Sequence, residues 1–362
     1  MENMVTHEYF KHIYGGKKVF VTGHTGFKGS WLISWLYLLG ADIKGYSLAP
    51  INDDDLYYQI KGDDLCQSVI ADIRNKTKLA KEIIDFQPDF IFHLAAQPLV
   101  RLSYDIPIDT FDVNIMGTAH VLDALRFLPQ KCTTIVITTD KVYENKEWHY
   151  PYRETDRLGG YDPYSASKAA AEIVISSYQN SFFNLNAFDK HQKSIATARA
   201  GNVIGGGDWA KDRIIPDIIR SLTNNKPIIV RNPQAVRPWQ HVLEPLAGYL
   251  LLGAKMNDDP LRYSSAWNFG PMAGDNLTVL QLVNIAIQAW GHGTYEHYKT
   301  VGQPHEAGLL KLDINKAIND LGWKPKWNAN DAIDKTISWY KQNLDTKINT
   351  QSFTFQQITE YG

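Results

Sequence analysis

A glycine-spaced turn near the start of the chain constrains its fold more than any other feature. Residues 18–22 form a short apolar strand pattern that ends at Gly23, and an apolar helix pattern over residues 31–39 follows. Between them, Gly23, Gly26 and Gly29 recur at the spacing that lets a backbone approach a pyrophosphate at a helix N-terminus. An ordinary strand–helix turn is the alternative. The position directly after the first strand favours a dinucleotide-binding turn.

Strand and helix patterns alternate over the first two hundred residues. Further strand patterns lie at residues 43–46, 90–94, 134–138 and 195–200, and helix patterns lie at 78–85, 114–127 and 165–178. This alternation predicts an α/β fold in which a doubly wound parallel (Rossmann-type) sheet carries helices on both faces.

The pattern changes after residue 202, where three glycines open a loop and prolines interrupt the next forty residues. We expect a dinucleotide-binding domain over residues 1–201, with a return around 239–270, because residues 267–270 have the pattern of one more strand. A smaller, mostly helical substrate-binding domain is expected from residues 202–238 and 271–362.

The charge balance favours a small-molecule ligand. The 362 residues have a formal net charge of −2 and no long basic run, which argues against nucleic acid and against a membrane surface. The only cysteines, Cys66 and Cys132, form no close pair, and the histidines lack ligand spacing, so no metal site is expected. No secretory leader is recognisable at the start, and we expect a cytoplasmic protein.

Tyr164 and Lys168 provide the first candidate catalytic pair. Four residues apart on a predicted helix, they share one face, so the ammonium group is expected to lower the pKa of the phenol. A phenol with a lowered pKa can act as a base near neutral pH.

Three polar residues follow the strand pattern at 134–138. The hydroxyl of Thr139 can bond a reacting oxygen at the carboxyl edge of the sheet, and Asp140 and Lys141 add two proton carriers. A strand-end cap and a loop ion pair are the alternatives. Beside Tyr164 and Lys168, we interpret them as groups for a reaction that also moves a proton on carbon and expels water.

The adenosine end of the cofactor site is less defined. Asp72 and Ile73 follow the expected third strand, where the carboxylate can accept from an adenine amino group, although a turn aspartate is the alternative. The second strand ends at Ser47 and lacks the acidic residue that binds a ribose 2′-hydroxyl, which leaves NAD and NADP open. His24 and Lys28 can accommodate a 2′-phosphate or can face solvent.

Arginines in the second region can bind a diphosphate. Arg213, Arg231 and Arg237 each carry a planar fork suited to bidentate phosphate contacts, although a lone arginine is more often a surface residue.

On these residues the chain resembles the nucleotide-sugar dehydratases among the extended short-chain dehydrogenase/reductases. The similarity extends over residues 17–339. It is carried by residues 21–31 (VTGHTGFKGSW), 92–101 (FHLAAQPLVR), 140–145 (DKVYEN), 198–209 (ARAGNVIGGGDW) and 237–245 (RPWQHVLEP).

The resemblance implies NAD as cofactor, a cytidine nucleotide sugar as substrate, and a homodimer or homotetramer paired through the helix bearing Tyr164. It places the catalytic groups at Thr139, Asp140, Lys141, Tyr164 and Lys168. It places cofactor contacts at Gly23, Thr25, Gly26, Phe27, Lys28, Gly29, Asp72, Ile73, Leu94, Ala95, Ala96, Tyr164 and Lys168. Substrate contacts are implied at Gln97, Ser103, Asn202, Arg213, Arg231 and Arg237.

The activity implied is oxidation at the sugar C4, loss of water across C5 and C6, and return of hydride to C6. Tyr164 is expected to take the C4 hydroxyl proton, Lys141 the C5 proton, and Asp140 to protonate the departing C6 hydroxyl. The dTDP-glucose dehydratases carry Asp-Glu where this chain has Asp140-Lys141, so the role of Lys141 departs from their pattern. The alternatives are an epimerase, a dehydratase of another nucleotide sugar, and a non-catalytic dinucleotide sensor.

Overall fold

A parallel sheet of seven strands forms the centre of the computed structural model, which describes residues 7–297, 309–344 and 349–362. The strand order is β3-β2-β1-β4-β5-β6-β11, which confirms the predicted doubly wound fold. The strands are β1 (Lys18–Thr22), β2 (Asp42–Ser47), β3 (Gln67–Ile70), β4 (Phe90–His93), β5 (Cys132–Ile137), β6 (Lys193–Ala200) and β11 (Ala266–Phe269).

Helices cover both faces of the sheet because alternate strand residues point to opposite sides. In β1, Val19 and Val21 join a core with helices α2 and α11, whereas Phe20 joins a second core with α4, α7 and α8. These helices are α2 (Phe27–Leu38), α4 (Lys76–Phe86), α7 (Gly117–Leu125), α8 (Pro163–Ser181) and α11 (Leu243–Asp258).

The remaining helices are shorter or lie at the periphery. At the start of the described chain, α1 buries Phe10 and Tyr14, and the Tyr14 hydroxyl donates to the carbonyl of Leu250 at 2.6 Å. The predicted helix at 114–127 is split into a π-helical turn, η2 (Asp112–Met116), and α7. The other helices are α1 (His7–Tyr14), α3 (Leu56–Gln59), α5 (Val100–Asp105), α6 (Pro107–Phe111), α9 (Phe188–His191), α12 (Pro260–Tyr263) and α15 (Thr350–Tyr361).

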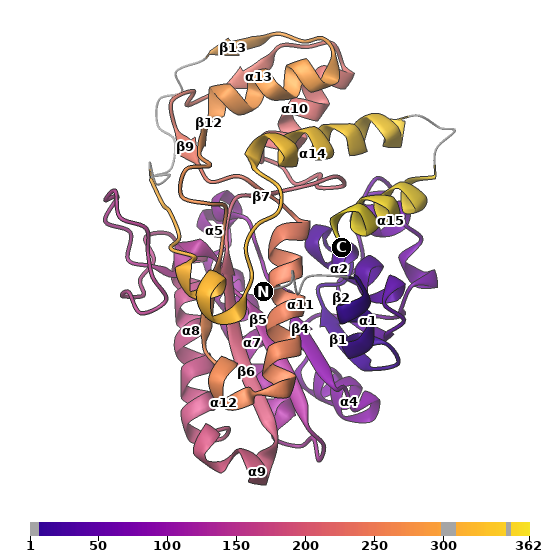
Figure 1. The fold of residues 1–362 in the computed structure, drawn as a ribbon, viewed down its shortest axis with the longest axis vertical. Coiled ribbons are helices and arrows are strands. Elements are labelled where there is room, and N and C mark those ends of the chain that lie inside the picture. The colour runs from indigo at the N-terminus through magenta and orange to yellow at the C-terminus, as the bar shows by residue number, and fades with distance from the viewer. Residues whose placement is uncertain (1–6, 298–308, 345–348) are drawn as a thin grey trace.

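A smaller region lies over the carboxyl ends of the strands, at the opposite end of the sheet from α9 and α12 (Figure 1). Because α9 directly precedes the start of β6, the strands run toward this region. It contains α10 (Ile214–Thr223), α13 (Val279–Trp290), α14 (Ala329–Leu344), β8 (Ile228–Val230), β9 (Val236–Arg237), β12 (Leu277–Thr278) and β13 (Tyr295–His297).

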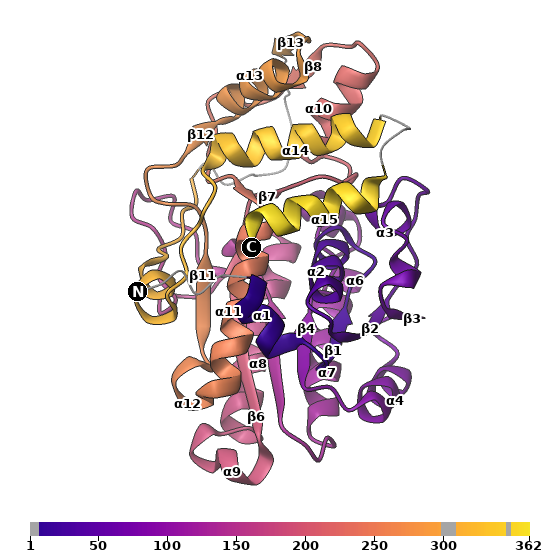
Figure 2. The same cartoon turned by 45° about the vertical axis from the view of Figure 1, so that its right-hand side comes forward.

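The chain crosses between the two regions more than once. Two short strands, β7 (Val203–Ile204) and β10 (Gln240–His241), pair with each other, and β11 then pairs with β6 in the main sheet. The C-terminal α15 lies against α2, where Tyr361 contacts Trp35 and Phe355 stacks on Tyr37 (Figure 2). The exact domain boundaries stay a prediction.

Candidate active site

The glycine turn has the shape that a dinucleotide needs. Gly23 has a φ of +75°, and a Cβ there would lie 2.8 Å from the backbone nitrogen of Ala95. A Cβ on Gly29 would lie 2.0 Å from the carbonyl oxygen of Gly23, so only glycine lets α2 start this close to the turn. Thr22 at the end of β1 accepts from the amides of Leu94 and Ala95, both at 3.1 Å, which joins this turn to the end of β4.

His24 corrects one expectation. The ring is fully buried, contacts Tyr57 edge-on, and bonds the Ser68 hydroxyl through Nε2 at 2.8 Å. It fits only because Gly45 has no Cβ, which would lie 2.3 Å from the ring. Burial lowers the pKa of His24 to about 4, so this side chain neither faces solvent nor offers a charge to a 2′-phosphate.

Lys28 has charged neighbours in the glycine turn. Burial and the neighbouring Arg213 lower the pKa of Lys28 to about 8, and the charges of Asp140 and Lys168 also act on its ammonium group. Its contact with a cofactor stays a prediction.

The adenosine end carries no acidic side chain at the end of β2. Instead, Thr25 donates to the Ser47 hydroxyl at 2.9 Å and to the Leu48 carbonyl at 2.8 Å. Asp72 lies just beyond β3, as expected, and forms an ion pair with Arg74 at 2.7 Å. Its contact with an adenine remains a prediction.

The predicted catalytic residues come together at the carboxyl edge of the sheet. Thr139 follows β5 and caps the short turn η3 (Asp140–Val142), and its hydroxyl donates to Asp140 Oδ1 at 2.9 Å. Tyr164 and Lys168 lie on the first turns of α8, whose start is set by Pro163 and by Asp162, which accepts from the Ser165 amide at 2.9 Å. All four side chains, Thr139, Asp140, Tyr164 and Lys168, are buried.

The pKa of Tyr164 differs from the prediction. Burial raises it to about 12, and the groups that oppose this rise are a hydrogen bond with Thr139 and the charge of Arg213. Lys168 instead donates to the carbonyl of Ile137 at 3.2 Å, and burial lowers its pKa to about 8. Desolvation of the phenolate outweighs the helical proximity of Lys168 in this structure.

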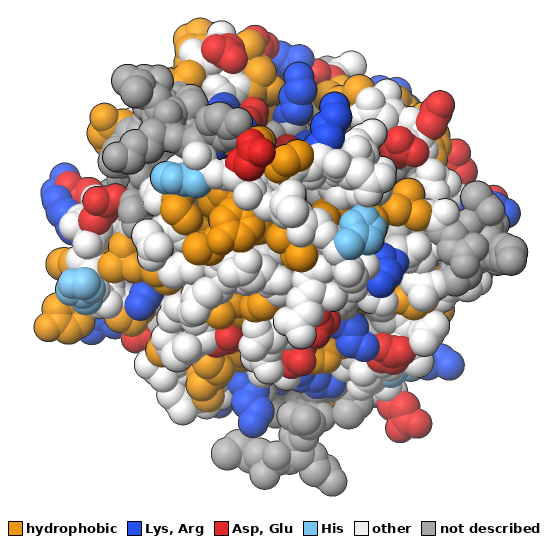
Figure 3. All heavy atoms as spheres, turned by 90° about the horizontal axis from the view of Figure 1, so that it is seen from above, with side chains coloured by type: hydrophobic (Ala, Val, Ile, Leu, Met, Phe, Trp, Pro, Cys, Tyr) orange, Lys and Arg blue, Asp and Glu red, His pale blue; other side chains and the backbone are white. Residues whose placement is uncertain are grey.

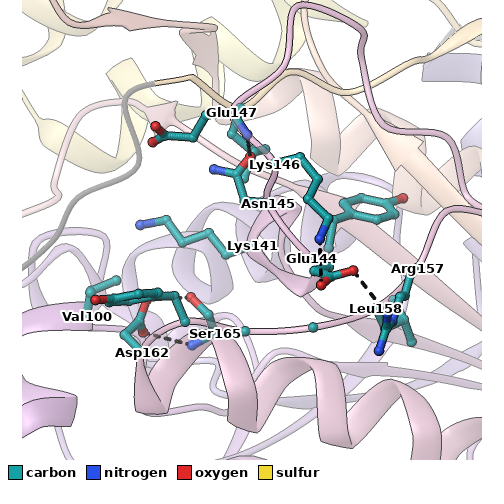
Figure 4. Close-up of a pocket in the computed structure, with 15 residues that line it drawn as sticks. Val100, Lys141, Glu144, Asn145, Lys146, Glu147, Arg157, Leu158, Asp162 and Ser165 are labelled. Atoms are coloured by element: carbon teal, nitrogen blue, oxygen red, sulfur yellow. Dashed lines mark hydrogen bonds and ion pairs between the residues drawn. The ribbon is translucent and has the colours of Figure 1, made fainter.

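Lys141 reaches into a cavity of about 420 Å³ beside α8. Figure 4 shows its side chain extended between the turn bearing Glu144, Asn145 and Glu147 and the start of α8. The walls are polar, since Glu144 forms ion pairs with Lys146 at 2.8 Å and with Arg157 at 3.5 Å. A half-buried amine in such a cavity can exchange a proton with a bound hydroxylated ligand.

A buried ion pair that the sequence did not reveal lies behind these groups. Arg199 on β6 binds Glu172 through two nitrogens, each at 2.8 Å, and Glu172 also accepts from Thr138 and Thr197. Arg199 further donates to the Tyr143 hydroxyl at 2.9 Å. Glu172 lies one helical turn beyond Lys168, and its charge raises the pKa of Lys168 against the effect of burial. The spacing of four residues from Lys168 is the sequence signal that could have indicated Glu172.

Two of the predicted substrate contacts are occupied by the protein itself. Gln97 donates to Thr110 at 2.9 Å and accepts from the Leu99 amide at 2.6 Å. The fully buried Ser103 accepts from the Tyr164 amide at 3.1 Å, which makes it a support for the tyrosine. Asn202, with a φ of 52°, directs its amide toward Asp140 Oδ2 at 3.4 Å.

The three predicted arginines contact neighbouring backbone or carboxylates. Arg213 pairs with Asp208 at 2.9 Å, and Arg231 pairs with Asp212 at 3.1 Å. Arg237 donates to the Val236 carbonyl at 3.1 Å. Asp212 also contacts Arg101 on α5, so one carboxylate connects the two regions of the chain.

Within the described ranges, no three His, Cys, Asp or Glu side chains gather closely enough to hold a metal ion. None of the helices in this part of the chain is long and apolar enough to span a bilayer.

Comparison with known proteins identifies the family. A family model described as GDP-mannose 4,6 dehydratase matches residues 20–336, and the chain belongs to this family. It is 48% identical over 331 residues to a CDP-glucose 4,6-dehydratase of Salmonella typhimurium, covering 91% of this chain and 92% of that protein. It is 28% identical to a CDP-paratose 2-epimerase of Salmonella typhi, covering 89% and 98% of the two chains.

Comparison with solved structures gives the same fold. A dTDP-glucose 4,6-dehydratase from Streptomyces venezuelae, solved with NAD and TYD bound, superposes with a TM-score of 0.76 at 24% identity. The match covers 90% of this chain and 97% of that one. At this identity the likeness establishes the Rossmann-type fold.

Proposed function

We propose that this protein is an NAD-dependent nucleotide-sugar 4,6-dehydratase that converts CDP-D-glucose to CDP-4-keto-6-deoxy-D-glucose. The observation that carries the proposal is the convergence of Tyr164, Lys168, Thr139, Asp140 and Lys141 at one sheet edge, beside the glycine turn. The 48% identical CDP-glucose 4,6-dehydratase supports the cytidine base. On the face of the molecule shown in Figure 3, Lys and Arg side chains are interspersed with Asp and Glu side chains. Such a surface suits a small ligand better than a polyanion.

NAD fits the glycine turn, where a Cβ on Gly23 or Gly29 would fill the approach to the backbone, and when bound it supplies a reversible hydride acceptor. Tyr164 takes the proton of the sugar C4 hydroxyl while Thr139 orients the oxygen. A cationic nicotinamide would counter the burial that raises the pKa of Tyr164.

Two further residues act once C4 is a ketone, which acidifies the C5 proton. Lys141 removes this proton in its neutral form and later returns it to C5. Asp140 donates a proton to the C6 hydroxyl, which leaves as water. Neither group is needed for simple epimerisation, so the pair favours dehydration.

The product assay tests this function. The protein is incubated with NAD+ and, separately, with CDP-, dTDP-, UDP- and GDP-glucose, and the mass loss of one water is measured. We expect water loss from CDP-glucose. Loss from another nucleotide alone would contradict the cytidine assignment, whereas no loss from any sugar would favour an epimerase or a dinucleotide sensor.

Lys141→Met tests the division of labour. The variant should lose water at least about 100-fold more slowly than wild type, because its base is absent, while C4 oxidation remains visible as NADH absorbance. Lys146→Met, on the same cavity wall, is the matched control and should retain activity. Normal dehydration by Lys141→Met would remove Lys141 from the mechanism.

We further propose that the protein is a cytoplasmic homodimer. Exposed apolar side chains lie on the neighbouring elements α6, η2 and α8, at Ile108, Met116 and Ile173. Such a patch on a helical face is typical of a subunit interface. Both cysteines are free thiols, which suits a reducing compartment. Light scattering that gave a monomer would contradict the dimer.

A further inference from the structure

We propose that a second, smaller cavity is the leaving-group pocket of the reaction: it takes the C6 hydroxymethyl group of the hexose and holds the water formed from it. Gln240 is the residue that recognises this hydroxyl. The inference rests on the proposed dehydratase function and gives a specificity role to Gln240, a residue of the 237–245 stretch to which the sequence motifs assign no function.

The pocket lies at η3, the turn of Asp140–Val142, but Lys141 does not line it. It has a volume of about 110 Å³. Asp140, Gly201 and Gln240 line it, together with the loop of residues 270–276, which includes Asn276. A water molecule needs about 10–15 Å³ of such space, so the pocket is large enough for a hydroxymethyl group and its product water. Thus Asp140 and Lys141, adjacent in sequence, serve two different cavities.

Asp140 is held in one orientation at the wall of this pocket. Thr139 donates to one carboxylate oxygen at 2.9 Å, and Asn202 donates to the other at 3.4 Å. A Cβ on Gly201 would lie 2.0 Å from Oδ2, so the glycine leaves room for the carboxyl group. An acid fixed in this way suits a leaving oxygen that arrives at one defined point.

Gln240 provides the second polar group. Its Nε2 donates to the carbonyls of Gly201 at 3.0 Å and Phe269 at 3.1 Å, which fixes the amide plane. Gln240 is only 1% exposed, and its Oε1 is buried. This oxygen has no hydrogen-bond partner within the described chain. A buried acceptor without a donor is costly, and a ligand hydroxyl or water is the usual remedy.

The two groups match the needs of the C6 hydroxyl. Its hydrogen can be donated to Gln240 Oε1 while its oxygen receives the proton of Asp140. The C6–O bond then breaks with its electron pair on oxygen, giving water, as Lys141 takes the C5 proton. Asp140 is left as a carboxylate, and the water remains bound to Gln240. His149 and Met272, both exposed, line the outer side, where this water can leave.

The experiment compares CDP-glucose with CDP-xylose, which lacks only the C6 hydroxymethyl group. For Gln240→Met we expect kcat/KM for CDP-glucose to fall about 10- to 100-fold, while the dissociation constant of CDP-xylose changes less than about threefold. Equal losses for both ligands would show a structural role for Gln240 and overturn the proposal. An unchanged kcat/KM would overturn it as well.

A second variant approaches the pocket from an exposed loop, where folding is not at risk. Ala273→Leu should fill the pocket, slow turnover of CDP-glucose and leave CDP-xylose binding intact; normal CDP-glucose turnover would count against the pocket. Wild type is assayed in the same series. If wild type removes no water from CDP-glucose, the function itself fails, whereas active wild type with normal variants refutes only the pocket.

Discussion

The candidate active site has two parts that are built in different ways: a buried floor, formed by His93, Tyr164, Glu172 and Arg199, and an exposed rim at Asp212 and Arg231. On the floor, the Arg199 and Glu172 side chains are 4% and 5% exposed, and neighbouring hydrogen bonds satisfy both. On the rim, the Arg231 and Asp212 side chains are 43% and 38% exposed, and Asp212 also contacts the partly exposed Arg101. The floor therefore resists rearrangement, whereas the proposed binding of a diphosphate by Arg231 would only replace one exposed anion with another.

The largest effect should come from the floor. Tyr164→Phe removes the group that we propose takes the C4 hydroxyl proton, so both NADH formation and water loss should fall by about 10³-fold or more. The rate of NADH absorbance on mixing with CDP-glucose measures this. Tyr161→Phe, an exposed tyrosine near the start of α8, is the matched control. Full activity of Tyr164→Phe would remove the tyrosine from the mechanism.

The buried ion pair should matter next, through stability. Arg199→Met leaves the Glu172 carboxylate buried without its cation, and we expect the free energy of unfolding to fall by about 3–5 kcal/mol. Denaturant unfolding measures this. Arg153→Met, at a side chain 69% exposed, should change stability by less than about 0.5 kcal/mol. Similar values for the two variants would mean that floor and rim do not differ in this way.

The floor should also make the protein acid-sensitive. Burial lowers the pKa of His93 to about 3, between Thr22 and Thr118, so the folded state holds it neutral while the unfolded chain binds a proton below about pH 6.5. The stability from His93 is therefore present above that pH and is lost as pH falls toward 3, by up to about 1.4 kcal/mol per pH unit.

His93→Gln should reduce the slope of unfolding free energy against pH between about 6 and 4 by this amount, as followed by denaturant unfolding across that range. His292→Gln, at an exposed position, is the control. An unchanged slope for His93→Gln would show that His93 titrates normally in the folded state.

The smallest effect is expected on the rim. Arg231→Ala should raise KM for CDP-glucose about tenfold with kcat within about twofold, because the predicted diphosphate contact is far from C4 and would stabilise ground and transition states alike. Added salt should reduce the difference between this variant and wild type. A fall in kcat as large as the rise in KM would place Arg231 with the floor.

Much of the sheet was predictable because its strands are buried on both faces and consist of apolar residues. Residues 18–22 were placed with the bounds that β1 has in the structure. The two-residue strands, such as β7 and β10, were not, because pairing between distant segments defines them and no local pattern does. Tyr164, Lys168, Thr139, Asp140 and Lys141 could be placed at the sheet edge from sequence because each lies on or directly after a recognisable element, and their catalytic roles stay a prediction.

The sequence by itself determined the glycine turn, the parallel direction of the strands and the family, because these depend on local spacing and short motifs. Only the tertiary structure decided which charges meet. Gly45 makes room for the His24 ring, burial raises the pKa of Tyr164 despite Lys168, and Gln240 comes beside Asp140 from a hundred residues away. Desolvation and hydrogen bonding depend on what surrounds a group in space, and residue spacing along the chain does not encode those surroundings.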